Sequence, residues 1–214
     1  MSMSQPQGYL AVPSAGSGAP VLVLHAWWGL NDTVRAICDR LAGEGYVVFA
    51  PDLYHGKVAH TIPEAETLGG ELDERVEQAR EEIQRAVAFL TERAGAGTDA
   101  VSVIGFSLGA FYALDLSARM PEAVRKVVIF YGSGPADFAN SQAAYLGHFA
   151  ADDPYEPQSN IDWVADELEA AGRPFKFYSY PGTGHWFFEP DRTDAFNAEA
   201  SALAWERTLA FLKG

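Results

Sequence analysis

The chain has 214 residues, of which 48% are hydrophobic and 21% are charged, as is typical of a folded globular protein and not of a disordered one. Its 29 Asp and Glu residues outnumber 15 Lys and Arg residues, and this net charge of -14 argues against nucleic acid or an anionic membrane as a partner. The single cysteine, Cys38, excludes an intrachain disulfide and favours a reducing compartment.

The first basic residue is Arg35, so no charged segment of the kind found in secretory signals precedes the first apolar run. No uninterrupted apolar run is long enough to span a bilayer. We therefore expect a cytoplasmic protein, a monomer or a small homo-oligomer, with no membrane contact.

Short apolar runs at 20–26 and 46–52 end in polar or turn-forming residues, as is typical of buried parallel strands. Between them, the sequence predicts a helix that begins at Asn31 or Asp32, both good N-caps, and ends near the glycines of 43–45. The first unit is therefore strand, helix, strand.

The same alternation continues to the end of the chain. The sequence predicts helices over 71–95, 159–171 and 195–212, and strands over 100–106, 126–132, 145–150 and 174–181. This order indicates an α/β fold with a mainly parallel, doubly wound sheet and helices on both faces. Since no linker or repeat divides the chain, we expect one domain over 1–214, with a small lid around 53–70.

The residues Gly105-Phe106-Ser107-Leu108-Gly109 match the G-x-S-x-G pattern between a predicted strand and a predicted helix. A sharp strand-to-helix turn needs glycines on either side of the serine, and it exposes the serine hydroxyl above the sheet. The alternative is that Ser107 only caps an ordinary helix. The context favours a nucleophile.

A serine hydroxyl is a weak nucleophile, so it needs a general base and an acid that orients the base. His185 follows the last predicted strand in a glycine-flanked loop and is the candidate base. We expect His25 and His148 to be structural because they lie on predicted strands, and His55 and His60 to lie in the lid.

The loop after the 145–150 strand offers Asp152 and Asp153 as the acid, and position alone does not choose between them. No metal-binding spacing of His or Cys and no phosphate-binding glycine loop is found in the sequence. We expect chemistry without a metal or another cofactor.

Six stretches of the chain, in order, are similar to the dienelactone hydrolase family of α/β-hydrolases: LHAWWGLND, APDLYHG, GFSLGA, HFAADDPYEP, YPGTGHWFF and AWERTLAFL. The resemblance implies a single-domain α/β-hydrolase fold and hydrolysis of small esters or lactones. It also favours Asp153, because residues 153–157 match the family's D-x-[FY]-x-P context; Asp152 stays the alternative. The resemblance further implies an oxyanion hole made by the backbone N–H groups of Trp27 and Leu108.

The chain departs from the well-studied family members at three positions. Ser107 replaces their cysteine, and Ala26 replaces a glutamate that acts on the thiol. An arginine that holds the substrate carboxylate is absent after His185, where Glu189 follows three aromatic residues. This acidic residue argues against an anionic dienelactone as the substrate.

Aromatic residues near these motifs suggest an apolar pocket, although several of them could pack in the core instead. They are Trp27, Trp28, Tyr54, Trp186 and Phe187. The interpretation is a serine hydrolase that cleaves a small, neutral or weakly polar ester or lactone through an acyl-enzyme. The alternatives are a thioesterase, an acyltransferase or a small peptidase with the same triad, or a non-catalytic binding protein on this scaffold.

Overall fold

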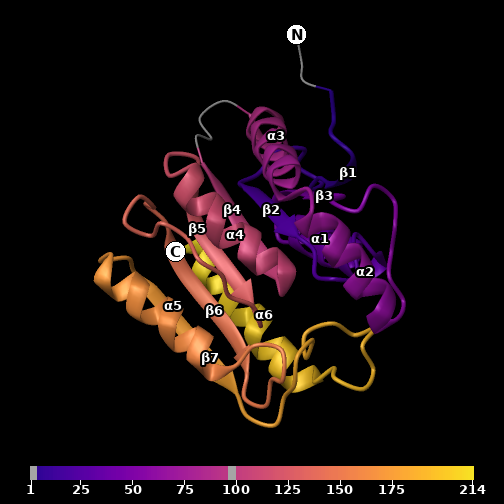
Figure 1. Ribbon diagram of the computed structural model, residues 1–214. Helices are drawn as coiled ribbons and strands as arrows, with labels where there is room; N and C mark the ends of the chain where they lie inside the picture. Colours follow the sequence, from indigo (N-terminus) through magenta and orange to yellow (C-terminus); the bar gives the residue numbers. More distant parts are fainter. Residues whose placement is uncertain (1–3, 96–99) are drawn as a thin grey trace.

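The computed structural model describes residues 4–95 and 100–214, and within these ranges one seven-stranded sheet is packed between helices (Figure 1). The strand order is β1-β3-β2-β4-β5-β6-β7; β1 is antiparallel to β3 and the other neighbouring pairs are parallel. The strands are β1 (Gly8–Ala11), β2 (Pro20–Leu24), β3 (Val47–Pro51), β4 (Val101–Phe106), β5 (Val124–Phe130), β6 (Ala144–Ala150) and β7 (Phe175–Tyr180). The helices are α1 (Asp32–Gly43), α2 (Ile62–Asp73), α3 (Val76–Ala94), α4 (Leu108–Arg119), α5 (Gln158–Ala170) and α6 (Ala198–Lys213).

The two apolar runs near the start of the chain form central strands. All five residues of β2 and all five of β3 are buried. Strands of a parallel sheet are covered on both faces, so they read as continuous apolar runs and not as alternating ones. The structure thus confirms the predicted α/β fold.

The helices cover both faces of the sheet. Figure 1 shows α3, α4 and α5 in front of the strands and α6 behind them. Helix α1 contacts α6, since the Arg40 guanidinium lies 3.9 Å from the ring centroid of Trp205. Within 4–95 and 100–214, no helix combines the length and the apolarity needed to cross a membrane.

The segment predicted as one helix over 71–95 is divided in the structure. Helix α2 ends at Asp73 and α3 begins at Val76. Thr61 and Glu64 form a reciprocal capping box that starts α2, and Leu68 and Leu72 are buried. The segment over 53–70 that was expected to form a small lid therefore contains most of a capped helix. Whether it moves as a lid stays a prediction.

The parallel strands end at a common edge of the sheet. The segments that follow β2, β4, β5, β6 and β7 therefore meet there, although they are far apart in the sequence. This edge carries the residues that the sequence singled out.

Candidate active site

Ser107 lies in a strained turn between β4 and α4. Its φ is 49° and its ψ is -112°, in a region that non-glycine residues rarely adopt. The surroundings hold this turn: the Ser107 amide donates to the Phe130 carbonyl at 2.9 Å, and the Ser107 carbonyl accepts from the Ala110 amide at 2.8 Å. The turn is thus fixed both to the neighbouring strand β5 and to the first turn of α4.

Glycines on either side of Ser107 allow this close packing. A Cβ atom on Gly105 would collide with the backbone of Gly109, and one on Gly109 would collide with the carbonyl oxygen of Leu24. The two glycines of the motif are therefore required by contacts between β2, β4 and α4, and not only by the flexibility of the turn.

The Ser107 side chain does not cap α4, although the residue occupies the N-cap position. Its Oγ lies 2.9 Å from Nε2 of His185. Nδ1 of His185 lies 2.7 Å and 2.9 Å from the two carboxylate oxygens of Asp153. Since an ionised carboxylate only accepts, Nδ1 carries the proton and Nε2 accepts from the serine hydroxyl.

The two candidate acids lie in different environments. The side chain of Asp153 is 3% exposed and that of His185 is 5% exposed. Asp153 Oδ1 also accepts hydrogen bonds from the amides of Tyr155 at 2.9 Å and Glu156 at 3.0 Å. Asp152, in contrast, is exposed. The structure therefore brings Asp153, and not Asp152, to His185.

A cavity of about 310 Å³ opens over Ser107. Its lining residues come from the loops after β2, β4, β5, β6 and β7 and from α4: Trp27, Ser107, Leu108, Phe111, Tyr131, Gly132, Ser133, Tyr155, Glu156, His185 and Trp186. Four non-glycine residues of the described ranges have positive φ, and three of them, Ser107, Tyr131 and Trp186, line this cavity. Backbone strain is concentrated at this site.

Trp27 and Leu108 both line this cavity, as expected for the two residues whose amides could bind an oxyanion. Leu108 is the first residue of α4, so its N–H has no acceptor within the helix. The positive end of the helix dipole lies at the same point.

The expected aromatic pocket is only partly formed. Trp186 lines the cavity, but Trp28, Tyr54 and Phe187 are not among its lining residues and are at most 3% exposed. Trp28 packs edge-on against Trp186 at 5.2 Å, and Tyr54 packs against His25 at 4.9 Å. These three side chains belong to the core.

Glu189 does not line the cavity either, so the expectation that it opposes an anionic substrate directly needs correction. Its side chain is buried behind the cavity wall, where it accepts a 2.7 Å hydrogen bond from the Tyr131 hydroxyl. Burial raises the pKa of Glu189 to about 8.

The carboxyl group in the cavity wall belongs to Glu156. The sequence pattern singled out this residue only as part of the 153–157 motif around Asp153, and not as a site residue. Glu156 is 8% exposed, and its Oε1 accepts a 2.8 Å hydrogen bond from Ser133 Oγ. Burial raises the pKa of Glu156, and hydrogen bonds from Ser133 and Asn160 oppose this shift. The sequence could have indicated Ser133 and Glu156 as residues of the site, because they lie in the segments that follow β5 and β6 at the common edge of the sheet.

None of the other four histidines is among the described residues that line this cavity. His25 and His148 are fully buried, and His148 is hydrogen-bonded to the hydroxyls of Tyr180 and Thr208. Burial lowers the pKa of both. His55 pairs with Glu82 at the surface. No cluster of three or more potential metal-binding side chains occurs within the part of the chain that the structure describes.

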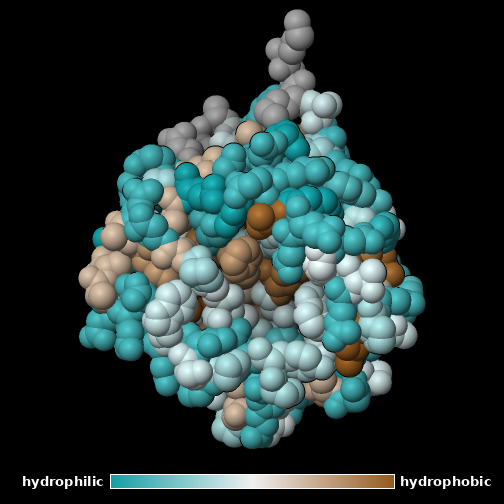
Figure 2. Space-filling view, viewed as in Figure 1, coloured by the Kyte–Doolittle hydropathy of each residue, from teal (hydrophilic) through white to brown (hydrophobic). Residues whose placement is uncertain are grey.

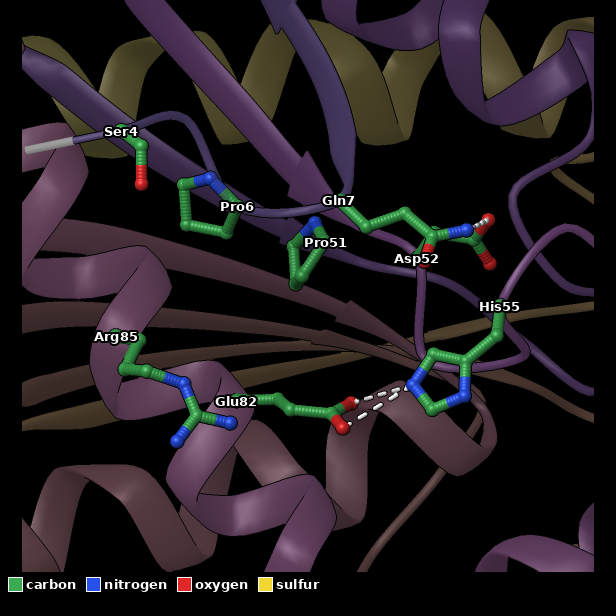
Figure 3. A pocket seen from close by; sticks show the side chains of 8 residues that line it. All are labelled: Ser4, Pro6, Gln7, Pro51, Asp52, His55, Glu82 and Arg85. Carbon is green, nitrogen blue, oxygen red and sulfur yellow. Dashed lines mark hydrogen bonds and ion pairs between the residues drawn. The ribbon is translucent and has the colours of Figure 1, made fainter.

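A larger cavity of about 520 Å³ lies beside the end of β3 and shares no lining residue with the first. Figure 3 shows His55 facing Glu82, and Gln7 reaching toward Asp52, in its wall. Asp52 accepts hydrogen bonds from the amides of Tyr54 and Gly56, so it organises its own loop. The smaller cavity is the candidate active site, because Ser107 and His185 lie in its wall and are hydrogen-bonded to each other, and His185 is hydrogen-bonded to Asp153.

Known proteins are similar to this chain over nearly its whole length. A family model described as the dienelactone hydrolase family matches residues 7–214. Protein usf of Aquifex pyrophilus is 31% identical, over 97% of this chain and 92% of that protein. A protein of Aquifex aeolicus, named provisionally as a carboxymethylenebutenolidase, is 30% identical over the same shares.

Solved structures give the same result. The structure named m3DLH has a TM-score of 0.85 and 25% identity, and the match covers 96% of this chain and 91% of that one. A dienelactone hydrolase-like promiscuous phosphotriesterase from metagenomic libraries has a TM-score of 0.83 and 25% identity over 94% and 89%. The family match, the α/β-hydrolase fold and the geometry at Ser107 agree, and the chain belongs to the dienelactone hydrolase family.

Proposed function

We propose that this protein cleaves a small carboxylic ester or lactone through a covalent acyl-enzyme on Ser107. Carboxylic-ester hydrolysis follows from the family; the proposal adds the residues, their roles and the kind of substrate. The observation that carries it is the hydrogen-bonded chain from Ser107 through His185 to Asp153, of which Ser107 and His185 lie in the wall of a cavity.

In the proposed mechanism, Ser107 Oγ attacks the carbonyl carbon while Nε2 of His185 takes its proton. The backbone N–H groups of Trp27 and Leu108 stabilise the oxyanion. His185 then delivers the proton to the leaving alcohol, and Asp153 stabilises the imidazolium. Water, deprotonated by the same histidine, releases the acid from Ser107.

A fluorophosphonate tests the nucleophile directly. The purified wild type should gain one adduct mass, mapped to Ser107 by peptide digestion, and Ser107→Ala should gain none. Ser133→Ala is the matched control, because Ser133 is the other serine in the cavity wall, and it should keep the adduct. On a simple aryl ester, Ser107→Ala should lose about 10⁵-fold or more of kcat.

Absence of an adduct on the wild type, with folding shown by circular dichroism, would reject Ser107 as an activated nucleophile. The same wild type, assayed against matched esters, lactones, thioesters and amides, separates an esterase from a thioesterase or a peptidase. Faster turnover of the thioester than of the oxygen ester, beyond their intrinsic difference in reactivity, would overturn the ester assignment.

A further inference from the structure

Glu156 is an acidic side chain with a defined place in the wall of the Ser107 cavity. Lys and Arg are absent from the residues that line this cavity, as far as the structure describes the chain. Among the described residues that line this cavity, Glu156 is the only one with an acidic side chain. A substrate in the cavity therefore meets the carboxyl group of Glu156 directly, whereas Asp153 lies outside the lining, behind His185.

The Glu156 side chain is held in place from two directions. Ser133, which follows β5, donates its hydroxyl to Oε1 at 2.8 Å, and the Asn160 side chain of α5 also forms a hydrogen bond with the carboxyl group. The Glu156 amide donates to Asp153 Oδ1 at 3.0 Å, which ties the backbone of this residue to the acid of the triad. The carboxyl group is therefore fixed relative to Ser107 and His185.

A fixed carboxylate accepts hydrogen bonds and attracts positive charge, and it repels a second carboxylate in the same small cavity. We propose that Glu156, supported by Ser133, is the specificity-determining residue of this site: it selects a substrate with a hydroxyl or ammonium group and rejects one with a carboxylate. The inference rests on the proposed ester or lactone hydrolysis. It deepens that function by naming the substrate class.

A rigid series of esters tests the proposal. The probes are nitrophenyl esters of cyclohexanecarboxylic acid with a trans-4 methyl, hydroxyl, ammonium or carboxylate group, because the trans ring prevents cyclisation and keeps the acyl part equal in size. The assays are run on the alkaline side of neutrality, because burial raises the pKa of Glu156. The readout is kcat/KM for each ester.

In the wild type, we expect kcat/KM to be highest for the ammonium and hydroxyl esters and lowest for the carboxylate ester. Glu156→Gln should reduce the ratio of kcat/KM for the ammonium ester to kcat/KM for the carboxylate ester by about ten-fold or more. In the same variant, the ratio of kcat/KM for the hydroxyl ester to that for the methyl ester should change less than the ratio for the ammonium and carboxylate esters, because the amide oxygen still accepts a hydrogen bond.

Asp152→Asn is the matched control. It removes one negative charge close to Glu156 in sequence, but from an exposed side chain outside the cavity wall. In this control, the ratio of kcat/KM for the ammonium ester to kcat/KM for the carboxylate ester should equal that of the wild type. An equal fall of the ratio in both variants would assign the preference to the net charge of the protein and overturn the role of Glu156.

A binding measurement separates this proposal from the proposed hydrolysis. Ser107→Ala, with and without Glu156→Gln, is titrated by calorimetry with the corresponding trans-4 ammonium and carboxylate cyclohexanecarboxamides. Preference for the ammonium compound that disappears with Glu156→Gln supports the subsite even if no ester is turned over. Equal Kd values for the two compounds with Glu156 present would overturn it, whatever the enzyme hydrolyses.

Discussion

Asp153 fixes both the tautomer and the orientation of His185. Its carboxylate accepts from Nδ1 at 2.7 Å and, through the other oxygen, from two backbone amides of its own loop. A carboxylate with three donors is itself rigid, so the imidazole ring is held with Nε2 toward Ser107. The exposed Asp152 beside it has no contact with His185 among the described interactions.

Asp153→Asn should lower kcat on an aryl ester by about 10³-fold to 10⁴-fold, because an amide at this position favours the wrong imidazole tautomer. Asp152→Asn is the adjacent control and should keep kcat close to the wild-type value. Steady-state kinetics of both variants, with circular dichroism to verify folding, checks the expectation. Full activity in Asp153→Asn would remove it from the proposed triad.

The sequence alone predicted the residues that meet at the site better than the residues that surround the substrate. Ser107 and His185 each follow a strand in a recognisable local context, whereas the choice of Asp153 over Asp152 came from the resemblance to the dienelactone hydrolase family. Whether an aromatic side chain faces a cavity or the core depends on side-chain packing, which one sequence does not encode locally. For this reason Trp28 and Phe187 were expected in the pocket, while Tyr131 and Glu156 were missed.

At the level of elements, the turn between β4 and α4 depends on glycines that permit close contact. The backbone of Gly109 occupies the space that a Cβ atom on Gly105 would need. Strand and helix must separate to accommodate even one methyl group there. The position of the Ser107 hydroxyl depends on this contact.

Gly105→Ala should therefore lower the free energy of unfolding by about 1–3 kcal/mol and reduce kcat at the same time. Gly70→Ala is the control: Gly70 lies inside α2 with no atom within 4 Å of the added Cβ. It should raise the free energy of unfolding by about 0.5–1 kcal/mol and leave kcat unchanged. Urea titration and ester kinetics on both variants check this pair; a stable, active Gly105→Ala would contradict it.

The strands and most helices could be predicted from the sequence. Buried strands are continuous apolar runs, and the helices have apolar residues at helical spacing. Helix α2 was missed, although Thr61 to Glu64 form the S/T-x-x-E signature of a capping box and Ala65, Leu68 and Leu72 give a helical spacing. Two adjacent glycines, Gly69 and Gly70, weakened this signal. The strand expected over 126–132 begins earlier and ends at Phe130, because the chain turns into the cavity wall there.

At the scale of the whole molecule, the protein is acidic and presents a largely hydrophilic face (Figure 2). The net charge is -14, and Figure 2 shows hydrophilic residues over most of one face, with hydrophobic residues gathered in a central hollow. The carboxyl group of Glu189 lies below this surface, since the residue is 3% exposed and accepts a hydrogen bond from the Tyr131 hydroxyl. Its protonation therefore affects the stability of the entire fold.

Burial raises the pKa of Glu189 from an ordinary 4.5 to about 8, so between these values the folded state binds a proton that the unfolded state has lost. This stabilising contribution is complete below pH 4.5 and is lost as pH rises to about 8. Glu189→Gln keeps an acceptor for Tyr131 but does not titrate. The difference in unfolding free energy, wild type minus variant, should therefore fall with pH by up to about 1.4 kcal/mol per unit.

Urea titrations of both proteins at several pH values across this window measure that difference directly. Subtracting the variant removes the contribution of every other titrating group that the two proteins share. A difference that stays constant between pH 4.5 and 8 would show that Glu189 keeps its ordinary pKa in the folded protein.

The positive φ angles of Ser107, Tyr131 and Trp186 set a limit on how this enzyme can be improved. Each such residue costs about 1–3 kcal/mol, and a typical domain has only about 5–15 kcal/mol of net stability. Tyr131 and Trp186 have large buried side chains, so replacing either with glycine would cost more packing energy than the backbone strain it relieves. Ser107 has no large side chain to lose, so a library selected for heat resistance alone would gain most by replacing it with glycine. Engineering for thermostability must therefore screen for turnover in every round.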